Sequence, residues 1–553
     1  MDEQSRKWMV LVSSTWIQAF TGTNIDFSSY SSNLKSVMEI SQLQLNYLAV
    51  ASDMGKLFGW CSGIFLLHSP LWIVLFIAAF MGLFGYGLQW LVIIRVISLP
   101  YFAVFLLCLL AGCSICWFNT ICYVLCIKNF PDNRPLALAF SISFNGVSAA
   151  LYNLIADSIQ SGNYTLYLLL NAIIPLIISL ISVLPIILHQ PSNIQPLSSQ
   201  AIRRDSLIFL FLNVLAVITG LYLLILDQIE TTSSIARALL AGAIILLLLP
   251  LFTPWIIQTS SIGRGSPSSF NLIDMGNFDV HKELIETNEG INDGFLLEEK
   301  KEGCCDCVVE KDQLVMLGDE HSSKRLLSRT DFWLYYVSYF CGGTVGLVYS
   351  NNIGQIAQSL GYGTSTTSVV ALYSACSFFG RLLSATPDIL RDKMYFSRTG
   401  WLAMSIVPLP FAFLILIISG SKVVLCVATA IVGLSSGFVF AAAVSVTSEL
   451  FGPNSAGVNH NLLITNIPMG SVMLGLLAAV VYDANIQGSS FLKAMFVGVE
   501  TSMVCMGRGC YTMTFVVWGL LSMLGILSSW LLFVRTKHVY HLVERKRSSF
   551  IFY

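Results

Sequence analysis

Fourteen apolar runs divide this chain, and each is long enough to cross a lipid bilayer. A transmembrane helix needs about 20 apolar residues, whereas a membrane-spanning barrel strand needs about 10 and alternates in polarity. The runs are continuous and have Gly and Pro scattered inside them. Hydrophobic residues make up 55% of the sequence and charged residues 11%, which a water-soluble core does not require. We therefore predict an all-α polytopic membrane protein with about fourteen spans.

The runs form two groups of six, which are separated by an extra pair and a polar stretch. The first six lie near 8–30, 43–67, 70–92, 100–127, 135–157 and 165–188, the pair near 206–227 and 235–257, and the last six near 331–353, 366–388, 398–419, 422–448, 456–482 and 513–535. The polar stretch has mixed charge and little apolar periodicity, as is typical of solvated linkers. We predict an N-terminal six-helix half (1–190), two additional helices (191–257), a largely disordered cytosolic linker (258–330), a C-terminal six-helix half (331–536) and a basic cytosolic tail (537–553).

A repeated hairpin indicates that the two halves are duplicated. The stretch AGCSICWFNTICYVLCIKNFPDNRPLALAF, which begins at Ala111, has a similar partner 321 residues later. In this alignment Gly433 stands for Gly112, Phe451 for Phe130, Asn454 for Asn133 and Asn466 for Asn145. Both copies are predicted to form a helix, a cytosolic hairpin and a second helix. They are therefore parallel repeats related by an axis along the membrane normal, a geometry that secondary transporters use.

The distribution of Lys and Arg predicts the orientation, because basic residues concentrate in short cytosolic loops. If the spans alternate, most basic loop residues fall on one side: Arg6, Lys7, Lys128, Arg134, Arg203, Arg204, Arg391, Lys393, Arg398 and the tail Arg545, Lys546 and Arg547. Both termini and the linker are then cytosolic. The opposite side receives Asn163, which is a glycosylation candidate in Asn-Tyr-Thr, and Cys505 and Cys510, which are a disulfide candidate.

Four ionisable residues inside predicted spans are the strongest functional candidates: Asp26, Asp53, Lys56 and Arg381. A charge at membrane depth costs at least a few kcal/mol and normally faces a polar cavity. The repeat places Lys56 opposite Arg381, so that two cations flank a central cavity and suit a carboxylate cargo. Asp26 or Asp53 would then couple transport to protons.

Each of these residues also has a purely structural interpretation. Asp53 and Lys56 are spaced to pair on one helix face. Arg381 can serve as a cytosolic gate charge that bonds to helix ends or to Asp388, and Asp26 can hydrogen-bond to a neighbouring helix. The amides Asn145 and Asn466 either line the cavity or bond between helices.

Other function classes lack their signatures. The chain has 30 Lys and Arg against 31 Asp and Glu, so composition gives no basic footprint for nucleic acid. No Walker A, HExxH or GxSxG pattern appears in the required context, and the histidines do not cluster at metal-ligand spacing. We expect no enzyme activity, no metal site and no cofactor.

Four stretches resemble one family. TWIQAFTGTNIDFSSYSSNLK, LNYLAVASDMGKLFGW, WFNTICYVLCIKNFPDNRPLALAF and CMGRGCYTMTF are similar to the plant nodulin-like, nuclear-fusion-defective-type branch of the major facilitator superfamily. The resemblance covers nearly the whole chain. It implies the major facilitator fold and a relationship to oxalate/formate and monocarboxylate carriers. Monocarboxylate carriers have an aspartate four residues before the corresponding arginine, and Ser377 stands there in this chain.

Together these observations predict a secondary active transporter that works by alternating access in the plasma membrane or in an endomembrane such as the vacuole. Its partners would be the lipid bilayer, a small organic anion such as a carboxylate, and protons. A sugar, an amino acid or a metal ion is the alternative cargo. A membrane organiser or receptor that has kept a transporter scaffold is the alternative function.

Overall fold

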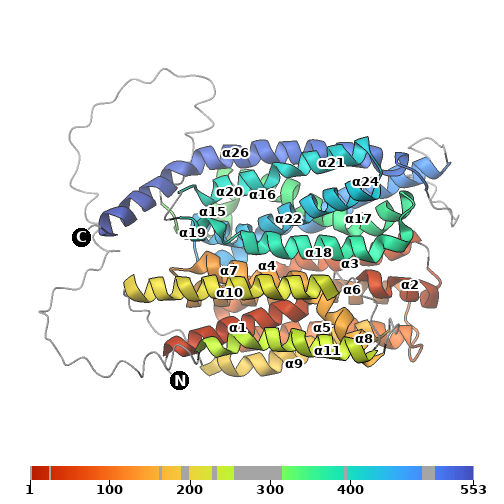
Figure 1. Cartoon of the computed structure of the whole chain (residues 1–553), viewed down its shortest axis with the longest axis horizontal. Coiled ribbons are helices and arrows are strands. Elements are labelled where there is room, and N and C mark those ends of the chain that lie inside the picture. The colour runs from red at the N-terminus through yellow and green to blue at the C-terminus, as the bar shows by residue number, and fades with distance from the viewer. Residues whose placement is uncertain are drawn as a thin grey trace, which may run out of the picture.

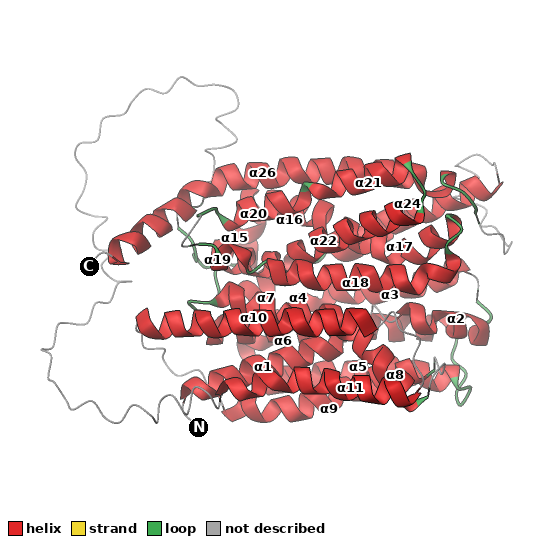
Figure 2. Ribbon diagram, in the orientation of Figure 1, coloured by secondary structure: helices red, strands yellow, loops and turns green. Residues whose placement is uncertain are grey.

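The computed structural model describes most of the chain as helix. The described residues are 3–23, 27–40, 42–160, 165–188, 199–226, 233–254, 314, 316–391, 395–487 and 505–551. These residues contain helices and no strand (Figure 2). The predicted all-α fold is therefore confirmed.

The helices of the N-terminal half and the extra pair follow the predicted order. They are α1 (Glu3–Thr21), α2 (Phe27–Met38), α3 (Gln42–Gly55), η2 (Lys56–Phe58), α4 (Gly59–His68), α5 (Leu71–Ile93), α6 (Tyr101–Asn129), α7 (Arg134–Ser143), η3 (Phe144–Val147), α8 (Ser148–Ile159), α9 (Leu166–Leu188), α10 (Ser199–Leu226), α11 (Ser233–Leu248) and η4 (Leu249–Leu251). Two of the predicted spans are thus interrupted by short 3-10 turns, one at Lys56 and one before Ser148.

The C-terminal half repeats this pattern. It contains α15 (Ser323–Ser328), α16 (Thr330–Tyr339), η5 (Phe340–Thr344), α17 (Val345–Ser359), η6 (Gly363–Ser365), α18 (Thr366–Leu383), α19 (Thr386–Ile389), α20 (Arg398–Ile406), α21 (Pro408–Ile418), α22 (Lys422–Phe451), α23 (Ala456–Leu463), α24 (Asn466–Gln487) and α26 (Gly509–Ile551). A π-helical turn separates α16 from α17. Such turns interrupt helices frequently at functional sites.

The helices lie side by side in two bundles, with the N-terminal half below and the C-terminal half above in Figure 1. Both chain ends lie at one end of the molecule. Pro254 and Leu314, which border the undescribed stretch between the halves, lie at that end too. Ser5 donates to the Pro254 carbonyl at 3.1 Å, and His538 Nε2 is 3.2 Å from the Leu314 carbonyl. We call this the terminal end and the opposite one the distal end.

Eleven helical stretches of the described residues are long and apolar enough to cross a membrane. They include both members of the extra pair, Arg204–Leu223 and Ser233–Pro254. The predicted spans at 8–30, 43–67 and 331–353 are not among the eleven. All three contain residues that line a cavity between the two halves, among them Tyr30, Lys56 and Asn351. The total of fourteen spans stays a prediction.

The extra pair is attached to the N-terminal half by polar contacts. Lys7 Nζ lies 2.5 Å from Asp205 Oδ2, and Ser206 Oγ donates to Asn133 at 3.2 Å. Two further bonds, from Trp16 to the Leu247 carbonyl and from Arg237 to the Ser158 carbonyl, hold α11. Against the C-terminal half, Gly220 of α10 packs on the Phe378 ring of α18. The pair therefore belongs to the N-terminal body and has an apolar contact with the other one.

Close helix contacts reveal the register of the repeat. Gly55 of α3 lies against the backbone of α6, and Gly380 of α18 lies in the same way against α22, where any Cβ would overlap a backbone atom. Two glycine contacts of the first half recur 325 residues later: Gly55 with Leu109 matches Gly380 with Leu434, and Gly112 with Ser52 matches Gly437 with Ser377. The prediction that Gly433 is the mate of Gly112 is therefore wrong by one helical turn, because α22 is shorter than α6 between this glycine and the hairpin.

The residues just before α16 dock on the C-terminal half. Glu320, which lies in the region predicted as linker, accepts hydrogen bonds from the backbone amides of Asn454 and Ser455 at 2.8 and 3.0 Å. Asn459 also donates to the His321 carbonyl at 3.0 Å. A carboxylate is favourable near a helix N-terminus, and α23 begins at Ala456. Residues 316–329 are thus attached to the hairpin between α22 and α23.

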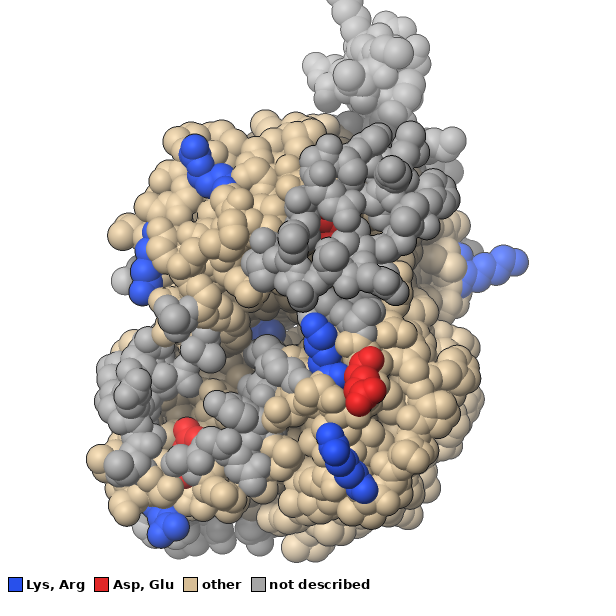
Figure 3. Space-filling model, turned by 90° about the vertical axis from the view of Figure 1, so that its right-hand side faces the viewer, with Lys and Arg blue, Asp and Glu red and all other residues tan. Residues whose placement is uncertain are grey.

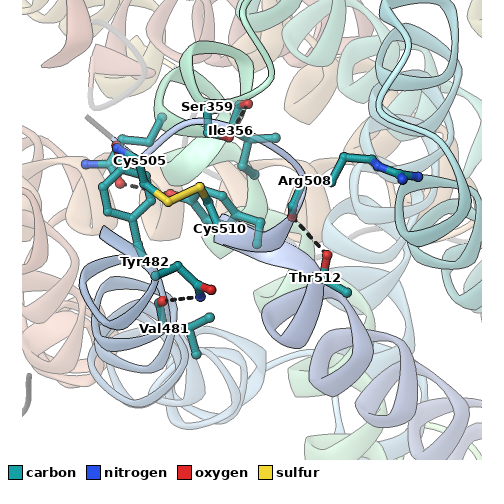
Figure 4. Close-up of a disulfide and its surroundings, with 11 residues drawn as sticks. Ile356, Ser359, Val481, Tyr482, Cys505, Arg508, Cys510 and Thr512 are labelled. Carbon is teal, nitrogen blue, oxygen red and sulfur yellow. Dashed lines mark hydrogen bonds between the residues drawn. A yellow bond between two sulfur atoms is a disulfide. The ribbon is translucent and has the colours of Figure 1, made fainter. Parts of the chain in front are cut away.

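A disulfide joins Cys505 to Cys510 at the distal end, in the loop that leads into α26 (Figure 4). Two neighbouring helices hold this loop. The Cys505 amide donates to the Tyr482 hydroxyl of α24 at 3.0 Å, and the Gly507 amide donates to the carbonyl of Ser359 in α17 at 2.7 Å. The disulfide therefore closes a short loop that connects α17, α24 and α26.

We expect Cys505→Ser to lower the free energy of unfolding by about 2 kcal/mol, because a disulfide across a short loop restricts the unfolded chain by this amount. Thermal unfolding of the purified protein would measure the loss. Cys426→Ser is the matched control, since Cys426 is a free and partly exposed cysteine of α22. Alkylation of both Cys505 and Cys510 in protein whose thiols were blocked at lysis would contradict the disulfide.

Candidate functional site

A cavity of about 640 Å³ lies between the two halves. Its distal part is lined by residues such as Tyr30 of α2 and Gln358 of α17, and its deep part by Asn145 and Arg381. Viewed from the distal end, the molecule is hollowed near its middle, and a basic side chain is visible inside (Figure 3). The cavity therefore opens toward the distal end.

Contacts between the halves close the cavity toward the terminal end. Gly63 of α4 packs on the backbone of Gly457 and Val458 in α23. Gly146 of η3 packs in the same way on the backbone of Phe378 in α18. A Cβ at either glycine would lie 3.0 Å or less from backbone atoms of the other half. Close apposition of two helix pairs thus seals this end, and the conformation is open on one side only.

Arg381 lies on α18 at the bottom of the cavity and is buried. Its Nη1 donates across the interface to Asn145 Oδ1 at 3.0 Å and to the Ile142 carbonyl at 3.4 Å. Its Nε has no hydrogen-bond partner in the described part of the chain, and neither has Asn145 Nδ2. Among the described residues, Asp388 pairs with Arg398 at 2.9 Å, and no carboxylate pairs with Arg381. Two adjacent donors are therefore left without an acceptor.

Lys56 and Asp53 form an ion pair, with 2.6 Å between Nζ and Oδ1. Both side chains are buried at the cavity wall. The second oxygen of Asp53 accepts from Asn351 of α17 at 3.2 Å and from Ser471 of α24 at 2.6 Å. The carboxylate therefore connects the N-terminal half to two helices of the C-terminal half. Lys56 is neutralised by its neighbour, whereas Arg381 is not.

A row of rings lines the cavity beside Arg381. Tyr123 packs edge-to-face on His460 with 5.4 Å between centroids, and His460 is 6.5 Å from Tyr339. Tyr339 packs on Phe440 at 5.9 Å, and the Arg381 guanidinium carbon lies 5.8 Å from the centre of the Phe440 ring. We call Tyr123, His460, Tyr339 and Phe440 the aromatic row. Tyr123 comes from α6 of the N-terminal half and the others from the C-terminal half.

The structure brings four of the predicted site residues to the cavity wall: Asp53, Lys56, Asn145 and Arg381. Asn466 is buried away from the cavity lining. It accepts from Thr344 Oγ1 at 2.6 Å and donates to the Tyr336 carbonyl at 3.4 Å. Asp26 and Asn163 lie outside the described residues.

Sequence reasoning missed the aromatic row and the partners of Asp53. Aromatic residues inside apolar spans are indistinguishable from core residues in a single sequence, so the row gave no signal. Asn351 and Ser471 are polar residues within predicted spans, which is a weak indication of contacts between helices. Within the described residues, no group of three or more His, Cys, Asp or Glu side chains is placed to hold a metal ion.

Comparison with known families and structures gives a consistent picture. A family model described as Nodulin-like matches residues 7–257, and one described as NFD4, C-terminal domain, matches residues 315–542. The chain is 51% identical to Protein NUCLEAR FUSION DEFECTIVE 4 of Arabidopsis thaliana, over 98% of this chain and 91% of that protein.

Among solved structures, the proton:xylose symporter XylE bound to 6-bromo-6-deoxy-D-glucose, a protein of the major facilitator superfamily, matches with a TM-score of 0.55. The two chains are 12% identical over 96% of each. A double Trp mutant of XylE matches with a TM-score of 0.54 and 11% identity, over 96% of this chain and 98% of that one. The predicted major facilitator fold is confirmed.

Proposed function

The chain belongs to the nodulin-like family that includes NUCLEAR FUSION DEFECTIVE 4 and has the major facilitator fold, and we propose that it is a secondary active transporter of a small organic anion. Arg381 carries this proposal. It is a buried cation at the base of a cavity between two duplicated halves, and no described carboxylate neutralises it. An unpaired buried charge is costly, and a bound anion would remove that cost.

Among small organic anions, a carboxylate fits the donors of this site best. Arginine presents a planar fork of donors that matches a carboxylate, and a hydrogen bond with a charged donor or acceptor is roughly twice as strong as a neutral one. The Nε of Arg381 and the Nδ2 of Asn145, which have no partner among the described residues, would both donate to the carboxylate. Because Asn145 belongs to the N-terminal half and Arg381 to the C-terminal half, one ligand would contact both moving bodies.

Asp53 is the candidate for proton coupling within the described residues. Its carboxylate bonds to Lys56 on its own helix and to Asn351 and Ser471 of the other half. Protonation would remove the charge that holds Lys56 and weaken the contacts across the interface. Proton binding would thereby shift the balance between the two orientations of the halves, as alternating access requires.

Basic residues at the terminal end support a cytosolic location for both termini. In that orientation the cavity would open to the non-cytosolic side, and the structure would correspond to the outward-facing state of the proposed cycle. The charges in the cavity also weigh against the alternative of a membrane organiser, because a scaffold without transport has no need for an unpaired buried arginine.

Uptake into proteoliposomes would test the proposal. Purified protein is screened against carboxylates, amino acids, sugars and metal ions, with and without a pH gradient. We expect uptake of carboxylates above that of protein-free liposomes and stimulation by an inward proton gradient. Uptake of a neutral sugar or a metal cation alone would contradict the anion proposal, and absence of all transport by folded protein would favour the organiser.

A further inference from the structure

The cavity combines one unbalanced positive charge with a continuous row of aromatic rings. Resting on the proposed function, we propose that the preferred cargo is a monocarboxylate that carries a planar aromatic ring. Its carboxylate would bind Arg381 and Asn145, and its ring would lie against the aromatic row.

The charge of the cavity points to a monoanion. Among its described lining residues only Asp53, Lys56 and Arg381 are charged. Asp53 and Lys56 cancel each other at 2.6 Å, so Arg381 alone remains to be neutralised. A second carboxylate on the cargo would enter a buried site without a cation to pair with, which is unfavourable.

The aromatic row points to a planar ring. Its members stand edge to face, which is the arrangement that aligns the positive edge of one ring with the negative face of the next. Phe440 is the last member and lies under the Arg381 guanidinium. A ring attached to a carboxylate on Arg381 is therefore directed at the faces and edges of the row. Saturated rings bury similar apolar area but cannot form these contacts.

Two tyrosine hydroxyls give the aromatic row groups that can hydrogen-bond. Tyr123 and Tyr339 line the cavity, and the described residues show no hydrogen bond from either hydroxyl. A cargo ring with a polar substituent would thus find partners there. The cavity volume of about 640 Å³ is within the range of sites that enclose small organic molecules.

Equilibrium binding of benzoate would test the inference, with cyclohexanecarboxylate as the matched saturated acid. Both are monoanions at neutral pH and differ in planarity and π electrons. The full-length protein in nanodiscs is titrated with each acid. We expect benzoate to bind about fivefold more tightly, which corresponds to about 1 kcal/mol, the middle of the range for one aromatic pair. Binding is preferred to uptake here because neutral benzoic acid crosses bilayers unaided.

Variants then locate the preference. Phe440→Leu keeps an apolar side chain and removes the ring, so the ratio of the two affinities should fall toward one while cyclohexanecarboxylate changes less than about twofold. Tyr123→Phe keeps the ring and should keep the ratio. Phe411→Leu is the matched control, since Phe411 lies on α21 and is exposed on the outer surface.

The possible results are distinguishable. If wild-type protein binds both acids equally and Arg381→Ala binds neither, the aromatic preference is wrong. The proposed transport of a small anion would then still stand. Tighter binding of phthalate, a dianion, than of benzoate would contradict the inference that the cargo carries one negative charge. Binding of glucose with no binding of any carboxylate would overturn both this inference and the proposed function. The wild-type ratio decides the matter even if a variant fails to fold.

Discussion

Arg381→Met is expected to reduce carboxylate affinity at least roughly 30-fold, which corresponds to the loss of about 2 kcal/mol from a buried charge pair. The substitution keeps most of the side-chain volume and removes both the charge and the fork. Arg381→Lys keeps the charge and loses the fork, so it should impair binding nearly as much. Binding to purified protein and uptake into proteoliposomes measure the two effects.

Stability distinguishes this role from a structural one. In the absence of cargo, Arg381 is a buried cation with one unsatisfied donor in the described part of the chain. We expect Arg381→Met to keep or raise the melting temperature while it weakens carboxylate binding. A gate charge with no role in binding would give the opposite pattern, with a lower melting temperature and normal carboxylate affinity.

Asp53→Asn is expected to lower the free energy of unfolding by about 3–5 kcal/mol, because it leaves Lys56 buried without its partner. The double variant Asp53→Asn/Lys56→Gln should recover much of this loss, since neither side chain is then charged. Thermal unfolding of the single and double variants forms a cycle that yields the coupling between them. Additive losses would contradict the ion pair.

The double variant also tests proton coupling. Without a protonatable group at position 53, uptake should no longer respond to a pH gradient, whereas exchange of internal for external anion should persist because it needs no net proton movement. A full response to the gradient in the double variant would exclude Asp53 and direct attention to Asp26, which lies outside the described residues.

Most of the fold could be predicted from the sequence, because helices in a bilayer depend on local properties of the chain. Run length and composition were enough to predict the helices, since every backbone group in lipid must be satisfied within its own segment. The breaks at Lys56 and at Phe144–Val147 were not predicted. Asn145 and Gly146 form an Asn-Gly pair, which is typical of turns and could have indicated the second break. Lys56, Leu57 and Phe58 are compatible with a helix, so the first break depends on packing between helices.

The candidate site could likewise be predicted only in part. The pair of Asp53 and Lys56 was foreseen because its members are three residues apart on one helix. The contacts of Asp53 with Asn351 and Ser471 join residues hundreds of positions apart, and so does the bond from Arg381 to Asn145. Spacing within a helix is visible in a sequence, whereas the apposition of two halves becomes visible only in the folded chain.

Counterflow in sealed proteoliposomes is the most direct test of an anion carrier that alternates around Arg381. Vesicles are loaded with an unlabelled carboxylate that the protein binds and diluted into a trace of the labelled compound without a pH gradient. We predict that the label accumulates transiently above its equilibrium level with wild-type protein and does not accumulate with Arg381→Met. Wild-type protein that shows no counterflow of any bound carboxylate, or counterflow that Arg381→Met leaves unchanged, would contradict the account.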